Sequence, residues 1–76
     1  MFAVKFDLPA FSIFPAQSWG AKFEVGMEGV APSMMPVGKL ENFTKFDNRE
    51  EAQTVLETSI NHPINATNLR IERIEA

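Results

Sequence analysis

One segment of this chain, residues 47–60, has the residue spacing of an amphipathic helix, and this pattern restricts the folds open to the rest. Asp47 is a good N-cap, and Glu50 three residues later completes a capping box. Pro63 ends the segment, because the residue before a proline disfavours the helical region. The inward-facing side chains recur at intervals of three and four: Ala52, Val55, Leu56, Ser59 and Ile60. The sequence therefore predicts one helix with a single face to bury.

Most other segments alternate apolar and polar side chains, which is the pattern of half-buried strands. Residues 29–38, GVAPSMMPVG, are an exception, because their prolines cannot donate to a strand ladder, and we expect a loop there. Residues 8–18 contain two further prolines and predict an irregular connection. Strands are expected at residues 2–7, 21–28, 39–46 and 69–76.

This order, β-β-β-α-β, predicts an α+β fold: a small two-layer sandwich in which one helix covers a mostly antiparallel sheet. If the third and last strands lie side by side and parallel, the helix is a right-handed crossover between them. We expect a single domain over residues 1–76, whose small core leaves a narrow stability margin. The chain has no cysteine, so no disulfide supports it.

The charge pattern narrows the partners and the compartment. The opening residues, MFAVKFDLPAF, interrupt apolar side chains with charged ones, unlike a secretory leader. No stretch approaches the roughly 20 apolar residues of a membrane span, so we expect a soluble, cytoplasmic protein with no membrane partner. The net charge of −3 argues against nucleic acid as a partner, because only Lys5 and Lys22 lie near the N-terminal aromatics.

Few residues are suited to catalysis. His62 is the sole histidine and Ser59 lies one turn before it, but the spacing matches no nucleophile elbow or triad. Glu50 and Glu51 are adjacent, so they point about 100° apart on a helix and cannot act as a close pair. No spacing typical of a metal, cofactor or phosphate site occurs. We therefore expect a protein that is not an enzyme and holds no metal or cofactor.

Charge is distributed unevenly along the chain. Residues 8–21 contain no charged side chain, whereas most charges lie from Lys39 onward. One short helix covers only one face of a small sheet, which leaves several large apolar side chains in proline-containing segments without an evident interior. Either these segments fold back and close the core, or they form a surface for another chain. The candidate protein-binding residues are Phe11, Phe14, Trp19, Met34 and Met35.

Three functional hypotheses follow. The first is a non-enzymatic binding protein that acts by protein–protein contact. In its size, single α+β domain and mild acidity the chain resembles the small accessory proteins of phages and mobile elements, for example inhibitors of a host defence complex. The second is a self-assembling structural or accessory subunit, as a homodimer or higher oligomer. The third is an oligomer that sequesters a small ligand between subunits, for which the sequence offers no specific polar constellation.

Overall fold

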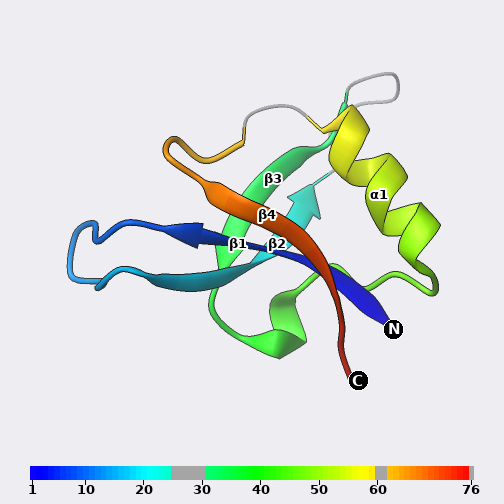
Figure 1. The fold of residues 1–76 in the computed structure, drawn as a ribbon, viewed down its shortest axis with the longest axis horizontal. Coiled ribbons are helices and arrows are strands. Elements are labelled where there is room, and N and C mark those ends of the chain that lie inside the picture. The colour runs from blue at the N-terminus through cyan, green and yellow to red at the C-terminus, as the bar shows by residue number, and fades with distance from the viewer. Residues whose placement is uncertain (25–30, 60–61, 76) are drawn as a thin grey trace.

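The structure is a computed structural model that describes residues 1–24, 31–59 and 62–75 (Figure 1). Within these residues, four strands form one antiparallel sheet in the order β3-β2-β1-β4, accompanied by one α-helix. The predicted α+β class and the order β-β-β-α-β are confirmed. The elements are β1 (Phe2–Leu8), β2 (Gln17–Glu24), β3 (Ser33–Val37), the 3-10 helix η1 (Leu40–Asn42), α1 (Arg49–Thr58) and β4 (Thr67–Arg73).

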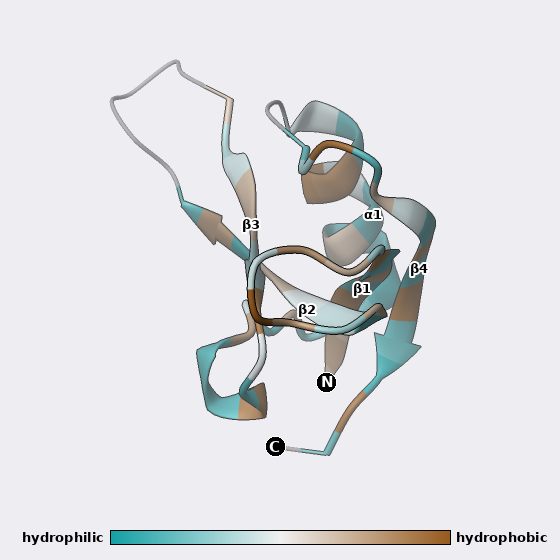
Figure 2. Cartoon of the chain, turned by 90° about the vertical axis from the view of Figure 1, so that its left-hand side faces the viewer, coloured by the Kyte–Doolittle hydropathy of each residue, from teal (hydrophilic) through white to brown (hydrophobic). Residues whose placement is uncertain are grey.

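The core lies between α1 and one face of the sheet (Figure 2). Strand side chains alternate between the two faces, so every second residue of β1 and β2 enters it. The inward stripe predicted for the helix is confirmed where the structure describes it, because Val55 and Leu56 pack half-buried against the cluster. Ile60 lies outside the described residues. The buried members of the cluster are Val4, Phe6, Leu8, Trp19, Ala21, Met34, Phe46 and Ala52.

The helix begins later than predicted. Asn48 rather than Asp47 is the N-cap, and its side-chain Oδ1 accepts a hydrogen bond from the Glu51 N–H at 2.9 Å. Phe46 is fixed in the sheet by a backbone bridge, so the chain uses both following residues to turn into the helix. Asparagine and aspartate are equally good caps, so the residue that lies directly before the first helical turn, Asn48, becomes the cap. The helix ends at Thr58, slightly before the predicted end.

The third strand lies within residues 29–38, where a loop was expected. Ala21 and Phe23 of β2 direct their backbone groups away from β3, toward the segment after η1. Their register partners on β3, Pro36 and Met34, therefore direct their own backbone groups toward the open edge of the sheet. A proline nitrogen in this outward position removes no hydrogen bond from the ladder, so a strand forms across Pro36.

The prediction of a strand at residues 39–46 is wrong. The first part of this segment forms η1, and its last part inserts where β1 and β2 diverge. There Phe46 and Phe2 exchange two backbone hydrogen bonds of 2.8 Å each, and the Thr44 N–H donates to the Ala21 carbonyl at 3.1 Å. The segment lacks a regular alternation of apolar and polar side chains, so it has no continuous face to bury as a strand.

β2 and β4 also differ from expectation. β2 begins at Gln17, earlier than predicted, because its first residues pair with the end of β1 in a hairpin. Residues 25–28 of the predicted second strand lie outside the described residues. β4 pairs antiparallel with β1, at the opposite edge of the sheet from β3, so the third and last strands do not lie side by side and the condition for a parallel crossover is not met. As a result, the β1–β2 hairpin and the connection that leads into β4 lie at the same end of the molecule (Figure 1).

Candidate functional site

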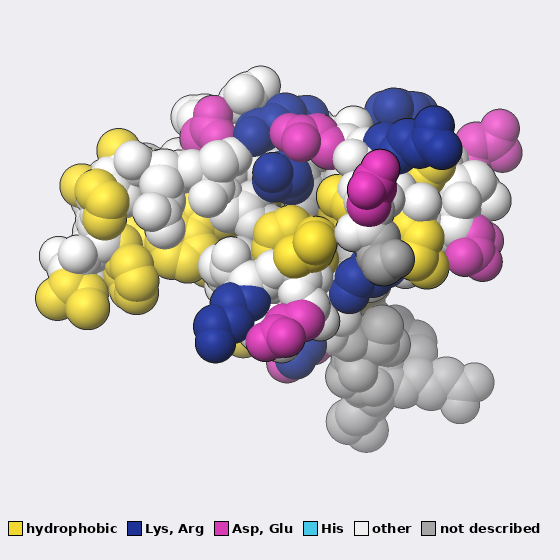
Figure 3. Space-filling view, turned by 90° about the horizontal axis from the view of Figure 1, so that it is seen from below, with side chains coloured by type: hydrophobic (Ala, Val, Ile, Leu, Met, Phe, Trp, Pro, Cys, Tyr) yellow, Lys and Arg dark blue, Asp and Glu magenta, His cyan; other side chains and the backbone are white. Residues whose placement is uncertain are grey.

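In the view of Figure 3, the end of the molecule formed by the β1–β2 hairpin shows hydrophobic side chains and no charged ones. Residues 8–18 of the hairpin contain no Asp, Glu, Lys or Arg, and neither do residues 62–69, which include the α1–β4 connection and the first residues of β4. Among the large hydrophobic side chains of this end, Ile13 is 88% exposed and Ile64 is 87% exposed, and Phe11 and Phe14 are 41% exposed each. We call the surface formed by Phe11, Ile13, Phe14 and Ile64 the apolar end.

The tip of the hairpin is a tight turn. The Phe11 N–H donates to the Phe14 carbonyl at 3.0 Å, and the Phe14 N–H donates to the Phe11 carbonyl at 2.9 Å. Ser12 has a φ of 51°, the left-handed region that glycine favours at the first residue of such two-residue turns. This geometry presents Ile13 to solvent between two aromatic residues.

The two phenylalanine rings of the turn pack on each other and on Trp19. Phe11 and Phe14 lie 5.5 Å apart between ring centroids, and both rings contact Trp19, at 5.7 and 5.2 Å. Trp19 is 7% exposed, and its Nε1–H is buried without a hydrogen-bond partner in the described part of the chain. Its position is therefore set by apolar and ring contacts. Such contacts make the tip a pre-ordered surface, which lowers the entropy lost when another chain binds.

A recess of about 330 Å³ lies beside the turn, where three parts of the chain converge. The end of β1 and the start of the hairpin form one wall, β3 contributes Pro36, and the α1–β4 connection forms the other wall. The lining is mostly apolar and has no charged residue: Leu8, Pro9, Ala10, Phe11, Pro36, Pro63, Ile64 and Asn65. Figure 2 views the molecule from this end, with the hydrophobic hairpin and connection toward the reader.

The five predicted binding residues do not form one surface. Phe11 and Phe14 are exposed at the apolar end, and Trp19 lies buried beneath them. Met34 is 2% exposed and belongs to the core, whereas Met35 is 41% exposed on the opposite face of the sheet. Trp19 in β2 and Met34 in β3 therefore belong to the core cluster.

Sequence reasoning missed the contribution of the α1–β4 connection. Pro63 and Ile64 lie more than 40 residues from the hairpin in sequence, and only the tertiary fold brings them to the recess. The available signal was an isoleucine in an uncharged segment, INATN, that predicted neither helix nor strand. An apolar residue in such a segment has no inner face to enter, which is the same reason that singled out Phe11 and Phe14.

A polar network on the outer face of the sheet is satisfied internally. Arg70 donates from Nε to Glu72 Oε2 at 2.6 Å, from Nη1 to Asp7 Oδ1 at 3.2 Å and from Nη2 to Ser18 Oγ at 2.5 Å. Asn68, which has a φ of 53°, donates to Asp7 Oδ2 at 3.1 Å. Hydrogen bonds from Asn68 and Ser18 lower the pKa of Asp7, and the hydrogen bond from Arg70 lowers the pKa of Glu72. Both carboxylates are thus ionised at neutral pH. The hydrogen bonds of the network connect β1, β2 and β4, so its role is to hold the sheet together.

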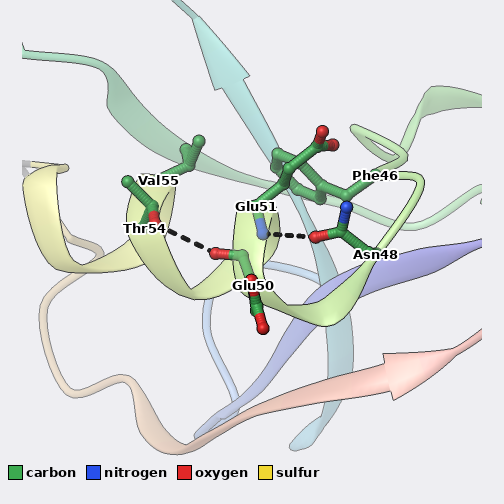
Figure 4. A pocket seen from close by; sticks show the side chains of 6 residues that line it. All are labelled: Phe46, Asn48, Glu50, Glu51, Thr54 and Val55. Atoms are coloured by element: carbon green, nitrogen blue, oxygen red, sulfur yellow. Dashed lines mark hydrogen bonds between the residues drawn. The ribbon is translucent and has the colours of Figure 1, made fainter.

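A second hollow, of about 520 Å³, lies at the start of α1 (Figure 4). Its two carboxylates, Glu50 and Glu51, point in different directions, as their adjacent positions on a helix predict. Asn48 is occupied as the helix cap, and the Thr54 hydroxyl donates to the Glu50 carbonyl at 3.0 Å. Among the described residues, no group of three or more His, Cys, Asp or Glu side chains is placed to hold a metal ion.

Ser59 and His62 are in contact, at 2.7 Å between Oγ and Nε2. The Ser59 hydroxyl also lies 2.8 Å from the Leu56 carbonyl, to which it donates its only proton. Because the hydroxyl is bonded to this backbone carbonyl, the contact with His62 is accounted for as part of the helix end. In the described part of the chain, no carboxylate orients the histidine. The contact closes the C-terminal turn of α1.

Comparisons with protein-family models, with curated proteins and with solved structures find no match to this chain. The assignment of a site therefore depends on the geometry alone. None of the helices in the described ranges is both long enough and apolar enough to cross a membrane.

Proposed function

We propose that this protein acts by protein–protein contact through its apolar end, as a non-enzymatic binding protein. The observation that carries this proposal is the exposure of Phe11, Ile13, Phe14 and Ile64 on an end without charge. Contiguous exposed apolar side chains mark interaction sites in monomeric proteins. Fully burying an isoleucine side chain contributes roughly 1.5–3 kcal/mol relative to leaving it exposed, and Ile13 and Ile64 have almost all of that contribution still to gain.

This mode of action requires no catalytic chemistry. Occlusion of a larger assembly, as a small inhibitor of a host complex would act, is one form of it, and we place the protein in the cytoplasm. The net charge of −3 does not favour nucleic acid as the partner. A self-assembling subunit is the second candidate function, and it is favoured by the recess beside the turn that carries Ile13.

The test is photo-crosslinking from single positions in the cells that produce the protein. A benzoylphenylalanine side chain replaces Ile13 in one variant and Leu40 in the control, because both are exposed aliphatic residues and Leu40 lies in η1, away from the hairpin. We expect position 13 to give defined protein adducts that position 40 does not give. Identical adducts from both positions, or none from position 13, would sink the proposal.

A further inference from the structure

We propose that the open edge of β4 binds an extended acidic segment of a partner protein. This surface is separate from the apolar end, so the inference goes beyond the proposed function. β4 (Thr67–Arg73) is the last strand at one edge of the sheet, and in Figure 2 no described segment lies beyond it. An edge strand presents a row of backbone N–H and C=O groups, and these are the groups with which an added strand pairs.

The pairing of β1 shows which residues of β4 direct their backbone groups outward. Phe2 exchanges two backbone hydrogen bonds with Phe46 on the side away from β4, so its register partner Arg73 directs its N–H and C=O toward the open edge. Ile71, two residues earlier, has the same orientation, and its carbonyl accepts a hydrogen bond from Arg49 Nη1 at 3.1 Å. The Ile71 N–H and both groups of Arg73 have no partner beyond this edge in the described part of the chain.

The other edge of the sheet is less suited to strand addition. Met34 and Pro36 are the outward residues of β3, and Pro36 has no N–H to donate. Proline on an edge strand is one of the features that protect a sheet from added strands. β4, with the sequence TNLRIER, contains no proline, so its backbone lacks this protection.

Two arginines determine the charge of the segment that this edge binds. Arg49 lies with its Cζ 5.2 Å from the centroid of the Phe2 ring, and Arg73 is the register partner of Phe2. Both arginines are exposed, and neither forms an ion pair within the described ranges, whereas Arg70 of the same strand is bonded to Glu72 at 2.6 Å. Guanidinium groups form charge-assisted hydrogen bonds with carboxylates. Charge complementarity therefore favours an acidic segment at this edge, although the chain as a whole has a net charge of −3.

Arg49 also provides selectivity. Its hydrogen bond occupies the Ile71 carbonyl, which is an acceptor that an added strand would use. A segment without acidic side chains displaces this bond and leaves the guanidinium without an acceptor. A carboxylate instead gives Arg49 a charged acceptor, which forms a stronger hydrogen bond than a neutral carbonyl does. The same side chain thus disfavours neutral and basic strands and favours acidic ones.

A peptide titration tests the inference. The probe is acetyl-Val-Glu-Val-Glu-Val-Glu-amide, which is added to the isotope-labelled full chain and followed by NMR. We expect it to shift the amide resonances of Ile71 and Arg73 and to slow the hydrogen exchange of their N–H groups. The matching lysine peptide, acetyl-Val-Lys-Val-Lys-Val-Lys-amide, should do neither. Unchanged amides throughout the titration, or equal shifts from the lysine peptide, overturn the inference.

Substitutions locate the binding on the edge. We expect Arg49→Gln and Arg73→Gln each to weaken the binding of the glutamate peptide by about 1.5- to 5-fold, which is the range of an exposed ion pair. Lys22→Gln is the matched control, because it removes the same charge from β2, which β1 separates from β4. Circular dichroism verifies that each variant is folded. A loss of affinity in Lys22→Gln as large as in the arginine variants, or no loss in either arginine variant, overturns the inference.

This titration and the crosslinking from position 13 probe different surfaces. Arg73 pairs with Phe2 at the start of β1, whereas the apolar end begins where β1 ends. A failed titration together with defined adducts from position 13 overturns the inference about β4 alone. Shifts at Ile71 and Arg73 without adducts from position 13 overturn the proposed function alone.

Discussion

Met34 and Met35 are adjacent in β3 but lie on opposite faces of the sheet, so serine substitutions at the two positions separate core packing from surface contact. Met34 is 2% exposed, and removing a buried methionine side chain costs about 2–5 kcal/mol. A serine hydroxyl without a partner in that core adds roughly 1–3 kcal/mol. Met35 is 41% exposed, and its replacement should change the free energy of unfolding by no more than about 0.5 kcal/mol.

Urea unfolding at fixed protein concentration measures this contrast, with the emission of Trp19 as the signal because it is the only tryptophan and is buried. Small domains have m-values near 1 kcal/mol per molar urea, so Met34→Ser should lower the midpoint by at least about 3 M or leave no folded protein in water. Met35→Ser should shift the midpoint by less than about 0.5 M. Equal shifts for the two variants, or a larger one for Met35→Ser, would refute the assignment of opposite faces.

Three further changes test separate parts of the structure. Gly20→Ala places a Cβ against the ring of Phe43, so we expect a loss of about 1–3 kcal/mol in thermal unfolding, and a neutral result would show that the ring does not lie there. Asn48→Ala removes the helix cap and should cost about 1 kcal/mol in the same assay, whereas Asn48→Asp should retain most of the stability; equal losses would rule out the cap. The pKa values of Asp7 and Glu72 are lowered in the folded state, so their stabilisation is present at neutral pH and is lost as the pH falls below about 4 through the lowered values. The melting temperature followed from pH 6 to pH 2 should therefore fall more steeply for the wild type than for Asp7→Asn, and parallel curves would contradict the network.

The parts of the fold that could be predicted are those in which one side-chain pattern determines the structure. The spacing of Ala52, Val55 and Leu56 fixes both the existence of α1 and the face it buries. The first strand is equally readable, because Val4 and Phe6 alternate with polar residues. The order of elements and the α+β class follow from these patterns, since a single amphipathic helix requires a sheet to cover it.

The third strand could not be predicted because it depends on how the backbone of the neighbouring strand β2 is oriented. Pro36 argues against a central strand, and only the orientation of Ala21 shows that β3 lies at an edge where the missing N–H has no partner to lose. The same limit applies to the site. Phe11 and Met34 look alike in sequence, as apolar residues near prolines, yet the hairpin exposes one and the register of β3 buries the other. Local pattern identifies candidates, and the pairing of strands decides which of them reach the surface.

The residues of the hairpin turn are not the ones that would best stabilise the folded chain. A two-residue turn that needs a positive φ at its first position is best served by glycine, with polar residues at the tip. This chain instead has Ser12 at a φ of 51° and an isoleucine at 88% exposure, flanked by two half-exposed phenylalanines. The two phenylalanines pack on Trp19, but Ser12 and Ile13 do not stabilise an isolated monomer, since the turn conformation disfavours a side chain and the isoleucine stays in water. The exposure of Ile13 becomes a favourable contribution once another apolar surface covers the turn, because the fixed turn holds this side chain ready to be buried. That balance supports a contact role for the apolar end more strongly than exposure alone.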